Sequence, residues 1–581
     1  MKINDFNWKI GGQAGFGIVS SGLMFAKIVT RGGLFIYSYV EKPSLIRGGH
    51  NTYQVYVNKK PVYSQRKQVD LLVALNSETV DLHLHELSVG SAVIIDSEKM
   101  RVDVAKLKRR KIKVYDIPFN RLAREAGGQE VMRNTVTLGA TVALLDYDLN
   151  ILEKVIKEQF SHKQADIAKK NIKAARSGYR YIIDNYKTSE FKCLLKPQKR
   201  QGKLMVITAN EASALGAIAA GCKFYAAYPM TPASSILHTL AKFGPDKGMV
   251  VRQVEDEISA INAIQGAATA GVRAMLATSG GGFALMVEGV SLAGITETPI
   301  VIVEAMRGGP ATGLPTWTEQ ADLQFVVSAG HGEFPRVVLA PGDAEEAFYL
   351  TALAFNLAEL MQSPVILLLD KYISENHLSL PFFDAGRIKI KRGKILSDKE
   401  AAQLGEKYRR YKVTKDGVSP RALPGQKGPV MFINSDEHDE MGFSEESAEN
   451  RIAQVDKRAR KINVVKPYLP PAKLYGPRQA DITLVGWGSV KGPVVDALAM
   501  GGFKKKVNFV HFNCVEPLPK NTLTLLQKAK KLVMVENNFT GQFARLLRAG
   551  TGIEIKDKIL RYDGRPFYPS ELIQEINKRF R

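Results

Sequence analysis

The most informative acidic residues of this sequence open an otherwise small and apolar helix. Residues 253–266 read QVEDEISAINAIQG, so Glu255, Asp256 and Glu257 precede a run rich in Ala and Ile. Acids at a helix N-terminus can simply compensate the helix dipole. A carboxyl group beside such apolar packing is expected to have a raised pKa, which suits a proton-sharing hydrogen bond to a cofactor nitrogen. The pattern leaves a structural and a catalytic interpretation open.

Two polar loops follow predicted strands. Residues 228–235 (YPMTPASS) come directly after a strand expected at 224–227, and residues 307–316 (RGGPATGLPT) come just beyond one expected at 300–303. Parallel α/β sheets bind ligands at the carboxyl ends of their strands. Thr231 presents a hydroxyl there, and Arg307 offers a fork that can hold a substrate carboxylate. The alternative for the first loop is a rigid strand-to-helix turn with a serine cap.

A glycine-rich stretch lies near the N-terminus. Residues 11–17 (GGQAGFG) follow a short strand, so Gly12, Gly15 and Gly17 could let backbone amides approach a phosphate. The glycine order is not GxGxxG, and a plain tight turn is an equal alternative. A second stretch, residues 43–50 (PSLIRGGH), could bring Arg47 and His50 to the same candidate phosphate site as the first glycine-rich stretch.

Motifs that the sequence lacks exclude several enzyme classes. GxSxG, HExxH and the P-loop are absent. Cys193, Cys222 and Cys514 are too few and too far apart for a disulfide framework, a zinc ribbon or a four-thiolate iron–sulfur cluster. Residues 436–440 (DEHDE) cannot converge on one ion from a helix or strand, so no metal site is predicted.

The elements that must position these residues predict an α/β protein with several parallel-sheet, three-layer domains. We expect an α/β domain over 1–190, a linker over 191–203, a second α/β domain over 204–384, a basic polar connection over 385–475 and a third α/β domain over 476–581. The boundaries follow losses of hydrophobic periodicity and gains of Lys and Pro.

Length and composition fit a multidomain globular protein. The 581 residues exceed the size of a single core, and the formal charge is +23. Residues 387–415 hold eleven Lys and Arg against three acids, and a solvated loop is the simplest interpretation. The sequence shows neither a signal peptide nor an apolar run of membrane-spanning length, so we predict a cytoplasmic location.

Four segments together carry a family resemblance. YPMTPASS, QVEDEISAINAIQGA, ATSGGGFALMVEGVSLAG and EAMRGGPATGLPTWTEQADL occur in this order within about 100 residues. They resemble the alpha subunit of the 2-oxoacid:ferredoxin oxidoreductases, which are thiamine-diphosphate enzymes. GGQAGFG and EKPSLIRGGHNTYQV resemble the gamma subunit of the same enzymes, fused here ahead of alpha. SPRALPG and MFINSDEHDEMGFSEESAENR look like the 2-oxoglutarate branch.

The resemblance implies the roles of individual residues. Glu257 matches the catalytic glutamate that hydrogen-bonds N1′ of the thiamine aminopyrimidine. Thr231 and Arg307 match contacts to the substrate, and Tyr228 and Thr312 line the same pocket. Pro229 is assigned to the cofactor side. The resemblance also implies a pyrimidine-binding-type domain over 204–384 and a transketolase C-terminal-like domain over 476–581. It further implies that Gly12, Gly15 and Gly17 bind the phosphates of coenzyme A.

The resemblance also implies partners. No GDG motif for Mg²⁺ and diphosphate occurs, and the cysteines for a 4Fe-4S cluster are missing, so both should come from a separate beta subunit. The implied reaction converts 2-oxoglutarate and coenzyme A to succinyl-CoA and CO₂ with electrons passed to ferredoxin, or the reverse, in a dimer of alpha–beta units. Pyruvate or a branched-chain 2-oxoacid is the alternative substrate. A basic nucleic-acid-binding protein is a distant alternative, which only the net charge supports.

Overall fold

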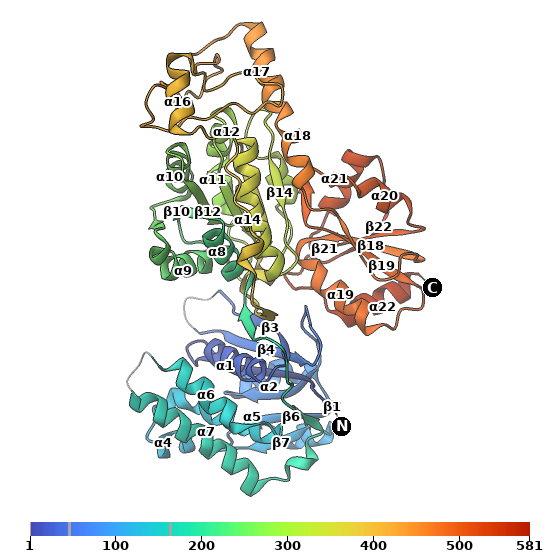
Figure 1. Ribbon diagram of the computed structural model, residues 1–581. Coiled ribbons are helices and arrows are strands. Elements are labelled where there is room, and N and C mark those ends of the chain that lie inside the picture. The colour runs from blue at the N-terminus through green and yellow to red at the C-terminus, as the bar shows by residue number, and fades with distance from the viewer. Residues whose placement is uncertain (1, 45–47, 162–164, 581) are drawn as a thin grey trace. The chain divides into compact units, whose positions relative to one another are not determined.

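The computed structural model describes residues 2–44, 48–161 and 165–580, which divide into two compact units (Figure 1). Unit 1 comprises residues 1–207 with the short segments 376–382 and 568–572. Unit 2 comprises residues 208–375, 383–567 and 573–581. Within the described residues, no helix has the length and apolar character that crossing a membrane requires.

Unit 1 is built on an eight-stranded mixed sheet. Its order is β7-β6-β5-β2-β4-β3-β16-β9. The pairs from β7 to β2 are parallel, and those from β2 to β9 are antiparallel. The strands are β2 (Asp5–Gln13), β3 (Phe35–Glu41), β4 (His50–Asn58), β5 (Val69–Ala74), β6 (Leu87–Ile95), β7 (Lys113–Asp116), β9 (Leu204–Ile207) and β16 (Leu378–Pro381), and a separate pair joins β1 (Lys2–Ile3) to β8 (Cys193–Leu194).

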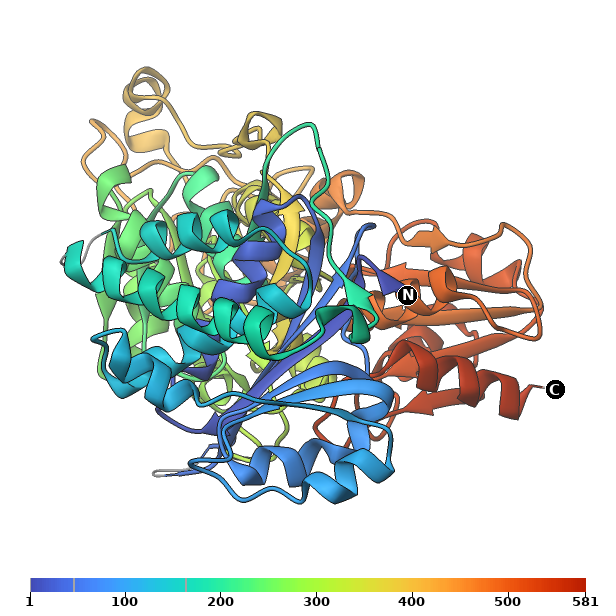
Figure 2. The same ribbon diagram turned by 90° about the horizontal axis from the view of Figure 1, so that it is seen from below.

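Helices cover this sheet. Figure 2 shows the teal helices α5, α6 and α7 on one face of the blue strands. Every residue of α5 is buried, since α5 packs against α7 and the core of the unit. The helices are α1 (Ile18–Arg31), α2 (Ser77–His83), α3 (Val104–Arg109), α4 (Phe119–Glu125), α5 (Arg133–Leu144), α6 (Leu149–Gln159) and α7 (Ala165–Asn185).

Unit 2 begins with a seven-stranded sheet in the order β11-β10-β12-β13-β15-β14-β20. All neighbours are parallel except β14 and β20. β13 is buried at all six positions, as expected for a central parallel strand covered on both faces. The strands are β10 (Cys222–Ala227), β11 (Val250–Gln253), β12 (Arg273–Thr278), β13 (Val301–Met306), β14 (Val337–Leu339), β15 (Val365–Asp370) and β20 (Cys514–Glu516).

Helices connect these strands, as parallel pairing requires. Asp256 caps α10 by accepting a hydrogen bond of 2.7 Å from the Ser259 amide. The helices are α8 (Ala209–Ala219), α9 (Ser234–Phe243), α10 (Glu257–Thr269), α11 (Gly280–Leu285), α12 (Val287–Ile295), α13 (Leu323–Ser328), α14 (Ala344–Met361) and α15 (Lys371–Glu375).

The rest of unit 2 contains an insert and a five-stranded sheet. The insert carries α16 (Asp398–Leu404), α17 (Ala448–Arg460) and α18 (Ile462–Val465). The sheet order is β17-β19-β18-β21-β22, antiparallel only between β17 and β19. Its elements are β17 (Lys473–Tyr475), β18 (Ile482–Trp487), β19 (Val507–Phe512), β21 (Leu532–Glu536), β22 (Asp557–Leu560), α19 (Lys491–Met500), α20 (Thr522–Gln527), α21 (Gln542–Thr551) and α22 (Pro569–Arg579).

The structure corrects the sequence prediction at three points. The first sheet is mixed rather than wholly parallel, because the strands from β2 through β4, β3 and β16 to β9 pair antiparallel. Leu204–Ile207 does not open the second domain but pairs with β16 in the sheet of unit 1. Within the predicted linker, β8 pairs with β1. Apolar content marked these segments as strands but did not indicate which sheet each one joins.

Candidate functional site

The carboxyl ends of four neighbouring strands gather the candidate residues of unit 2. β10 leads into the loop of Tyr228, β11 leads to Glu257, β12 leads to α11, and β13 leads to Arg307. Because these strands are parallel, their ends lie at one edge of the sheet. The fold therefore brings together loops that are about 80 residues apart in the sequence.

Glu257 is the first residue of α10 and is only 3% exposed. Its Oε1 atom is buried and has no hydrogen-bond partner among the described residues. Burial raises the pKa of this carboxyl group above its ordinary value. A Cβ atom added to Gly282 would lie 2.5 Å from Glu257 Oε1 and 2.1 Å from Thr278 Oγ1, so only glycine fits against the carboxyl group. A buried carboxyl oxygen without a partner is typical of a group that meets a ligand.

Thr231 and Arg307 are in direct contact. Arg307 Nη1 donates a hydrogen bond of 2.7 Å to the backbone oxygen of Thr231. Both residues are half-buried. Pro229 and the exposed Tyr228 lie between β10 and Thr231. A guanidinium fixed to a backbone oxygen is oriented before a carboxylate arrives. The sequence-predicted substrate residues Thr231 and Arg307 are therefore adjacent.

Thr312 lies further out. It is exposed at the tip of a turn that an antiparallel bridge between Gly308 and Leu314 closes. The turn places Thr312 on the same loop as Arg307, away from the buried part of the sheet edge.

Sequence reasoning missed two acids next to Arg307. Glu304 lies on β13 with 0% exposure, and both of its carboxyl oxygens are without a donor among the described residues. Burial and the nearby charge of Asp322 hold the pKa of Glu304 well above its ordinary value. Burial raises the pKa of Asp322 to about 6. A lone Glu inside the apolar strand VIVEAM was the available signal.

Gln320 fixes the loop that carries Asp322. The fully buried Gln320 amide donates to the Asn537 oxygen at 2.7 Å, and its side-chain nitrogen donates to the Trp487 oxygen at 3.0 Å. Its side-chain oxygen accepts from the Asn537 amide at 3.0 Å. The C-terminal sheet thus holds the position of an acid that belongs to the first sheet of unit 2.

The glycine-rich segment of unit 1 has a different geometry from that predicted. Gly12 lies inside β2, paired with Asn51, and not in the turn. Gly15 and Gly17 have φ angles of +89° and +73°, and Gly17 precedes α1 as its N-cap. The turn therefore needs glycine at these two positions.

His50, on the neighbouring strand, takes part in a buried network. Its Nε2 atom is 2.9 Å from His83 Nε2, and Glu86 contacts His83 Nδ1 at 2.9 Å. Glu86 also accepts a hydrogen bond from Lys9. Arg47, which the sequence placed beside His50, lies outside the described residues.

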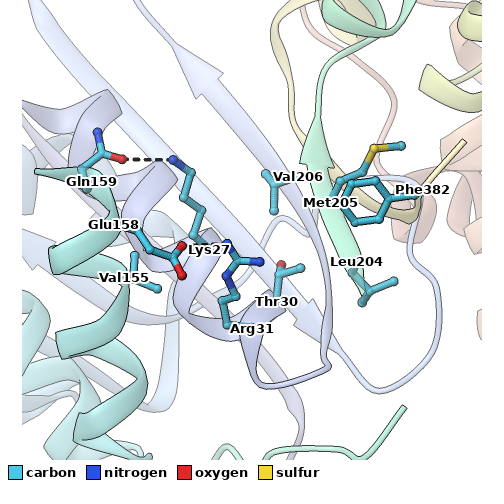
Figure 3. Close-up of a pocket in the computed structure, with 10 residues that line it drawn as sticks. All are labelled: Lys27, Thr30, Arg31, Val155, Glu158, Gln159, Leu204, Met205, Val206 and Phe382. Carbon is cyan, nitrogen blue, oxygen red and sulfur yellow. Dashed lines mark hydrogen bonds and ion pairs between the residues drawn. The ribbon is translucent and has the colours of Figure 1, made fainter. Parts of the chain in front are cut away.

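Unit 1 also has a pocket of about 340 Å³ between α1, α6 and the edge strand β9. Figure 3 shows Lys27 and Arg31 facing Glu158 and Gln159 across it. Lys27 donates to Gln159 at 3.0 Å, and Arg31 pairs with Glu158 at 2.7 Å. Because these side chains already bind one another, the pocket is a weaker candidate site than the sheet edge.

The basic segment 387–415 is not entirely solvated. Arg410 is 4% exposed and donates to the backbone oxygens of Thr296 and Glu297 at 3.2 and 2.8 Å. Lys394 is exposed and pairs with Asp416 at 2.8 Å. Part of the positive charge of the segment therefore stabilises the attachment of the insert.

Two family models match this chain. One, described as pyruvate flavodoxin/ferredoxin oxidoreductase, thiamine diP-bdg, matches residues 215–457, which include the sheet edge of unit 2. The other, described as pyruvate ferredoxin/flavodoxin oxidoreductase, matches residues 7–181 of unit 1. With the fold, they define the class as that of the oxidoreductases that use ferredoxin or flavodoxin.

Full-length relatives narrow the class. The 2-oxoacid:ferredoxin oxidoreductase subunit alpha of a Sulfolobus species is 32% identical, covering 98% of this chain and 96% of the relative. The 2-oxoglutarate synthase subunit KorA of Methanothermobacter thermautotrophicus is 32% identical over 64% of this chain and 98% of its own. This chain belongs to the family of 2-oxoacid:ferredoxin oxidoreductase alpha subunits, and the name of the subunit implies a multi-subunit enzyme.

A solved structure agrees over the whole length. The 2-oxoglutarate:ferredoxin oxidoreductase of Magnetococcus marinus, with 2-oxoglutarate, coenzyme A and succinyl-CoA bound, superposes with a TM-score of 0.91 and 30% identity and covers 100% of both chains. The family resemblance stated from the four sequence segments is confirmed.

Proposed function

We propose that this chain is the gamma-fused alpha subunit of a thiamine-diphosphate-dependent enzyme that converts 2-oxoglutarate and coenzyme A to succinyl-CoA and CO₂. Ferredoxin takes the electrons, and the reaction can run in reverse. The observation that carries the proposal is the buried, partnerless Oε1 of Glu257 at the carboxyl edge of a parallel sheet. The names of the similar Methanothermobacter and Magnetococcus proteins support 2-oxoglutarate over pyruvate as the substrate.

The residues of the sheet edge fit the aminopyrimidine of thiamine diphosphate. Glu257 would hold a proton at its ring nitrogen N1′, since a carboxyl group with a raised pKa shares a proton readily. Gly282 packs closely against Oε1, where a side chain would clash, and Pro229 follows β10 at the same edge. When bound, the cofactor supplies the electron sink for cleavage next to the substrate carbonyl.

Thr231 and Arg307 hold the carboxylate and the oxo group of the substrate. The Arg307 fork is already oriented by the Thr231 backbone, so little side-chain entropy remains to be lost on binding. Tyr228 and Thr312, which are exposed, border the entrance.

A separate beta subunit completes the site. It would hold the diphosphate with Mg²⁺ and carry the 4Fe-4S cluster, since this sequence has no GDG motif and only three cysteines, all buried. Two alpha–beta units would form the enzyme. Gly15 and Gly17, with the strand residue Gly12 before them, are the proposed site for the phosphates of coenzyme A in unit 1.

The test is anaerobic, coenzyme-A-dependent reduction of viologen by this chain co-purified with its beta partner. We expect Glu257→Gln to lower kcat by about 10²–10⁴-fold, the usual contribution of a positioned acid or base. Glu255→Gln is the matched control, because Glu255 is exposed two residues earlier and bonds Ser259 in its own turn. Equal rates for both variants, or activity without the partner, would contradict the proposal. Competition between 2-oxoglutarate and pyruvate tests the substrate.

A further inference from the structure

Unit 1 contains a buried polar network that the proposed function does not use. Lys9 on β2 is 2% exposed, and its ammonium group donates to Glu86 Oε2 at 2.5 Å. The other oxygen of Glu86 lies 2.9 Å from Nδ1 of the buried His83, the last residue of α2. His83 Nε2 lies 2.9 Å from Nε2 of His50, the first residue of β4. The four polar side chains thus form a chain of contacts that ends at His50.

The donors and acceptors of this network fix the tautomer of each imidazole. The ion pair with Lys9 keeps Glu86 as a carboxylate, which can only accept hydrogen bonds. His83 Nδ1 therefore carries a hydrogen and donates it to Glu86. The Lys9 ammonium, 3.4 Å from the same nitrogen, disfavours a second positive charge on His83, so its Nε2 keeps a lone pair.

The tautomer of His50 follows from that of His83. His50 must donate from Nε2 to His83 Nε2, which leaves its own Nδ1 unprotonated in the neutral ring. Burial, together with His83 and Lys9, lowers the pKa of His50 to about 4, in agreement with a neutral ring. His50 Nδ1 is buried and has no partner among the described residues. It is therefore an acceptor that lacks a donor.

A second buried polar atom without a partner belongs to the same face of β4. Thr52 is 1% exposed, and its hydroxyl oxygen makes no hydrogen bond within the part of the chain that the structure describes. His50 and Thr52 are two positions apart on one strand, so their side chains point to the same face of the sheet. His50 Nδ1 can only accept, whereas the Thr52 hydroxyl can also donate. Together they match a neutral ligand group with both a donor and an acceptor, such as an alcohol or a secondary amide.

This face of β4 borders the glycine turn of unit 1. Gln13, the last residue of β2, pairs with His50. Gly15 and Gly17, which form the turn, follow within four residues. A Cβ atom added to Gly11 would lie 3.1 Å from the His50 ring, so the ring packs directly on β2. A ligand with phosphates at the turn would bring its neighbouring groups close to His50.

We propose that His50 and Thr52 bind the uncharged pantetheine arm of coenzyme A, which carries an alcohol and two secondary amides. The inference rests on the proposed function, in which the glycine turn binds the coenzyme A phosphates. The arm begins at the diphosphate, so its alcohol and first amide lie only a few bonds from the phosphates. One of these groups donates to His50 Nδ1, and an oxygen of the arm accepts from the Thr52 hydroxyl. Glu86 and His83 are positioning residues, because they act through the tautomer of His50.

The first test measures dissociation constants by calorimetry with the assembled enzyme. The probes are coenzyme A, pantetheine, which lacks the nucleotide, and adenosine 3′,5′-bisphosphate, which lacks the arm. Thr52→Val removes the hydroxyl, and His50→Gln keeps a polar group near the Nε2 position but removes Nδ1. Each should weaken coenzyme A and pantetheine about 3–10-fold, the usual effect of losing one neutral hydrogen bond, and leave the bisphosphate unchanged.

His85→Gln is the matched control, because His85 is exposed and lies two residues after His83. It should bind all three probes as the wild type does. Unchanged coenzyme A affinity in both Thr52→Val and His50→Gln would mean that only water meets these atoms, and it would overturn the inference. An equal loss of affinity for the bisphosphate would do the same, because the effect would then not belong to the arm.

A second measurement is independent of turnover and uses nuclear magnetic resonance of the assembled enzyme with ¹⁵N-labelled histidine in this chain. At neutral pH, His50 should show an unprotonated Nδ1 and a protonated Nε2, assigned by the loss of both signals in His50→Gln. Pantetheine should shift the Nδ1 signal. In the double variant K9Q/E86Q, which removes the ion pair as a unit, this tautomer should no longer be fixed.

A protonated Nδ1 in the wild type, or no shift of its signal at saturating pantetheine, would refute the inference. The same tautomer in K9Q/E86Q would refute the positioning role of Glu86. If the enzyme turns over no 2-oxoacid while the Nδ1 signal responds to pantetheine, the proposed function fails and the binding site for the arm stands.

Discussion

Two buried acid clusters of unit 2 have opposite chemistry. Glu297, at the end of α12, is 0% exposed and pairs with Lys457 at 2.6 Å and with Lys461. These cations hold the pKa of Glu297 far below its ordinary value, despite the burial that opposes this. Glu304 is equally buried, but its pKa is raised by that burial and by the acidic neighbour Asp322.

The difference separates a structural acid from a functional one. Lys457, which neutralises Glu297, lies on α17, and Lys461 directly follows this helix. The ion cluster therefore attaches the insert to the seven-stranded part of unit 2. Glu257 and Glu304, at the carboxyl edge, are left with oxygens that no donor among the described residues satisfies. Unsatisfied buried acids are unfavourable for folding, and a ligand-binding site is a physical reason for keeping them.

The largest expected effect is on stability. Glu297→Gln should destabilise the folded chain by about 3–5 kcal/mol, because it leaves two buried lysines without their counter-ion. Glu304→Gln should be nearly neutral, because no cation loses a dedicated partner. Chemical denaturation of both variants measures the two free energies of unfolding. Equal losses would remove the distinction between the clusters.

The next effect is on activity and uses three consecutive glycines of α11. Gly282→Ala places a methyl group against Glu257 and Thr278, whereas Gly281→Ala meets no atom within 4 Å. A displacement of about 1 Å at a catalytic group can cost roughly 10²-fold in rate. We expect that loss of kcat/KM for Gly282→Ala and wild-type kinetics for Gly281→Ala. Similar kinetics for both would argue against a role of Glu257 geometry.

A smaller effect is expected on the pH dependence of stability. The pKa of Asp322 is raised from an unfolded value near 3.9 to about 6, so the folded chain binds more protons in this range and loses stability as the pH rises through it. The wild type should therefore lose melting temperature relative to Asp322→Asn mainly between about pH 4 and 6, the interval between the two pKa values. The exposed Asp246→Asn is the control and should follow the wild type at every pH. A constant difference for Asp322→Asn would contradict the raised pKa.

The smallest effect concerns the exposed cations of the insert. The charge of residues 387–415 could steer an acidic ferredoxin, and the exposed Lys389 and Lys399 are available for this. Reversing both charges to Glu should lower the ferredoxin-linked rate severalfold at low salt and leave viologen reduction unchanged. An equal fall of both rates would exclude docking. Arg410 is unsuitable for this test because it is buried against Glu297.

Sequence patterns predicted the α/β class and the six parallel strands from β10 to β15, because most of these strands are buried and apolar. They also predicted that Thr231, Glu257 and Arg307 follow strand ends. They misplaced Leu204–Ile207 and missed the hairpin-like half of the first sheet, since a strand's composition does not encode its partner.

The sequence by itself determined the family and the types of residue that can do the chemistry, because motif spacing and strand-end positions are local properties. Only the tertiary structure decided which acids meet a cation. Glu297 and Glu304 are only seven residues apart, and nothing local distinguishes their ionisation. Lys457 and Lys461 reach one from about 160 residues away, while Gln320, held by the C-terminal sheet, positions the loop of Asp322 beside the other. The free energy of a buried charge depends on such long-range neighbours, which a sequence pattern does not place.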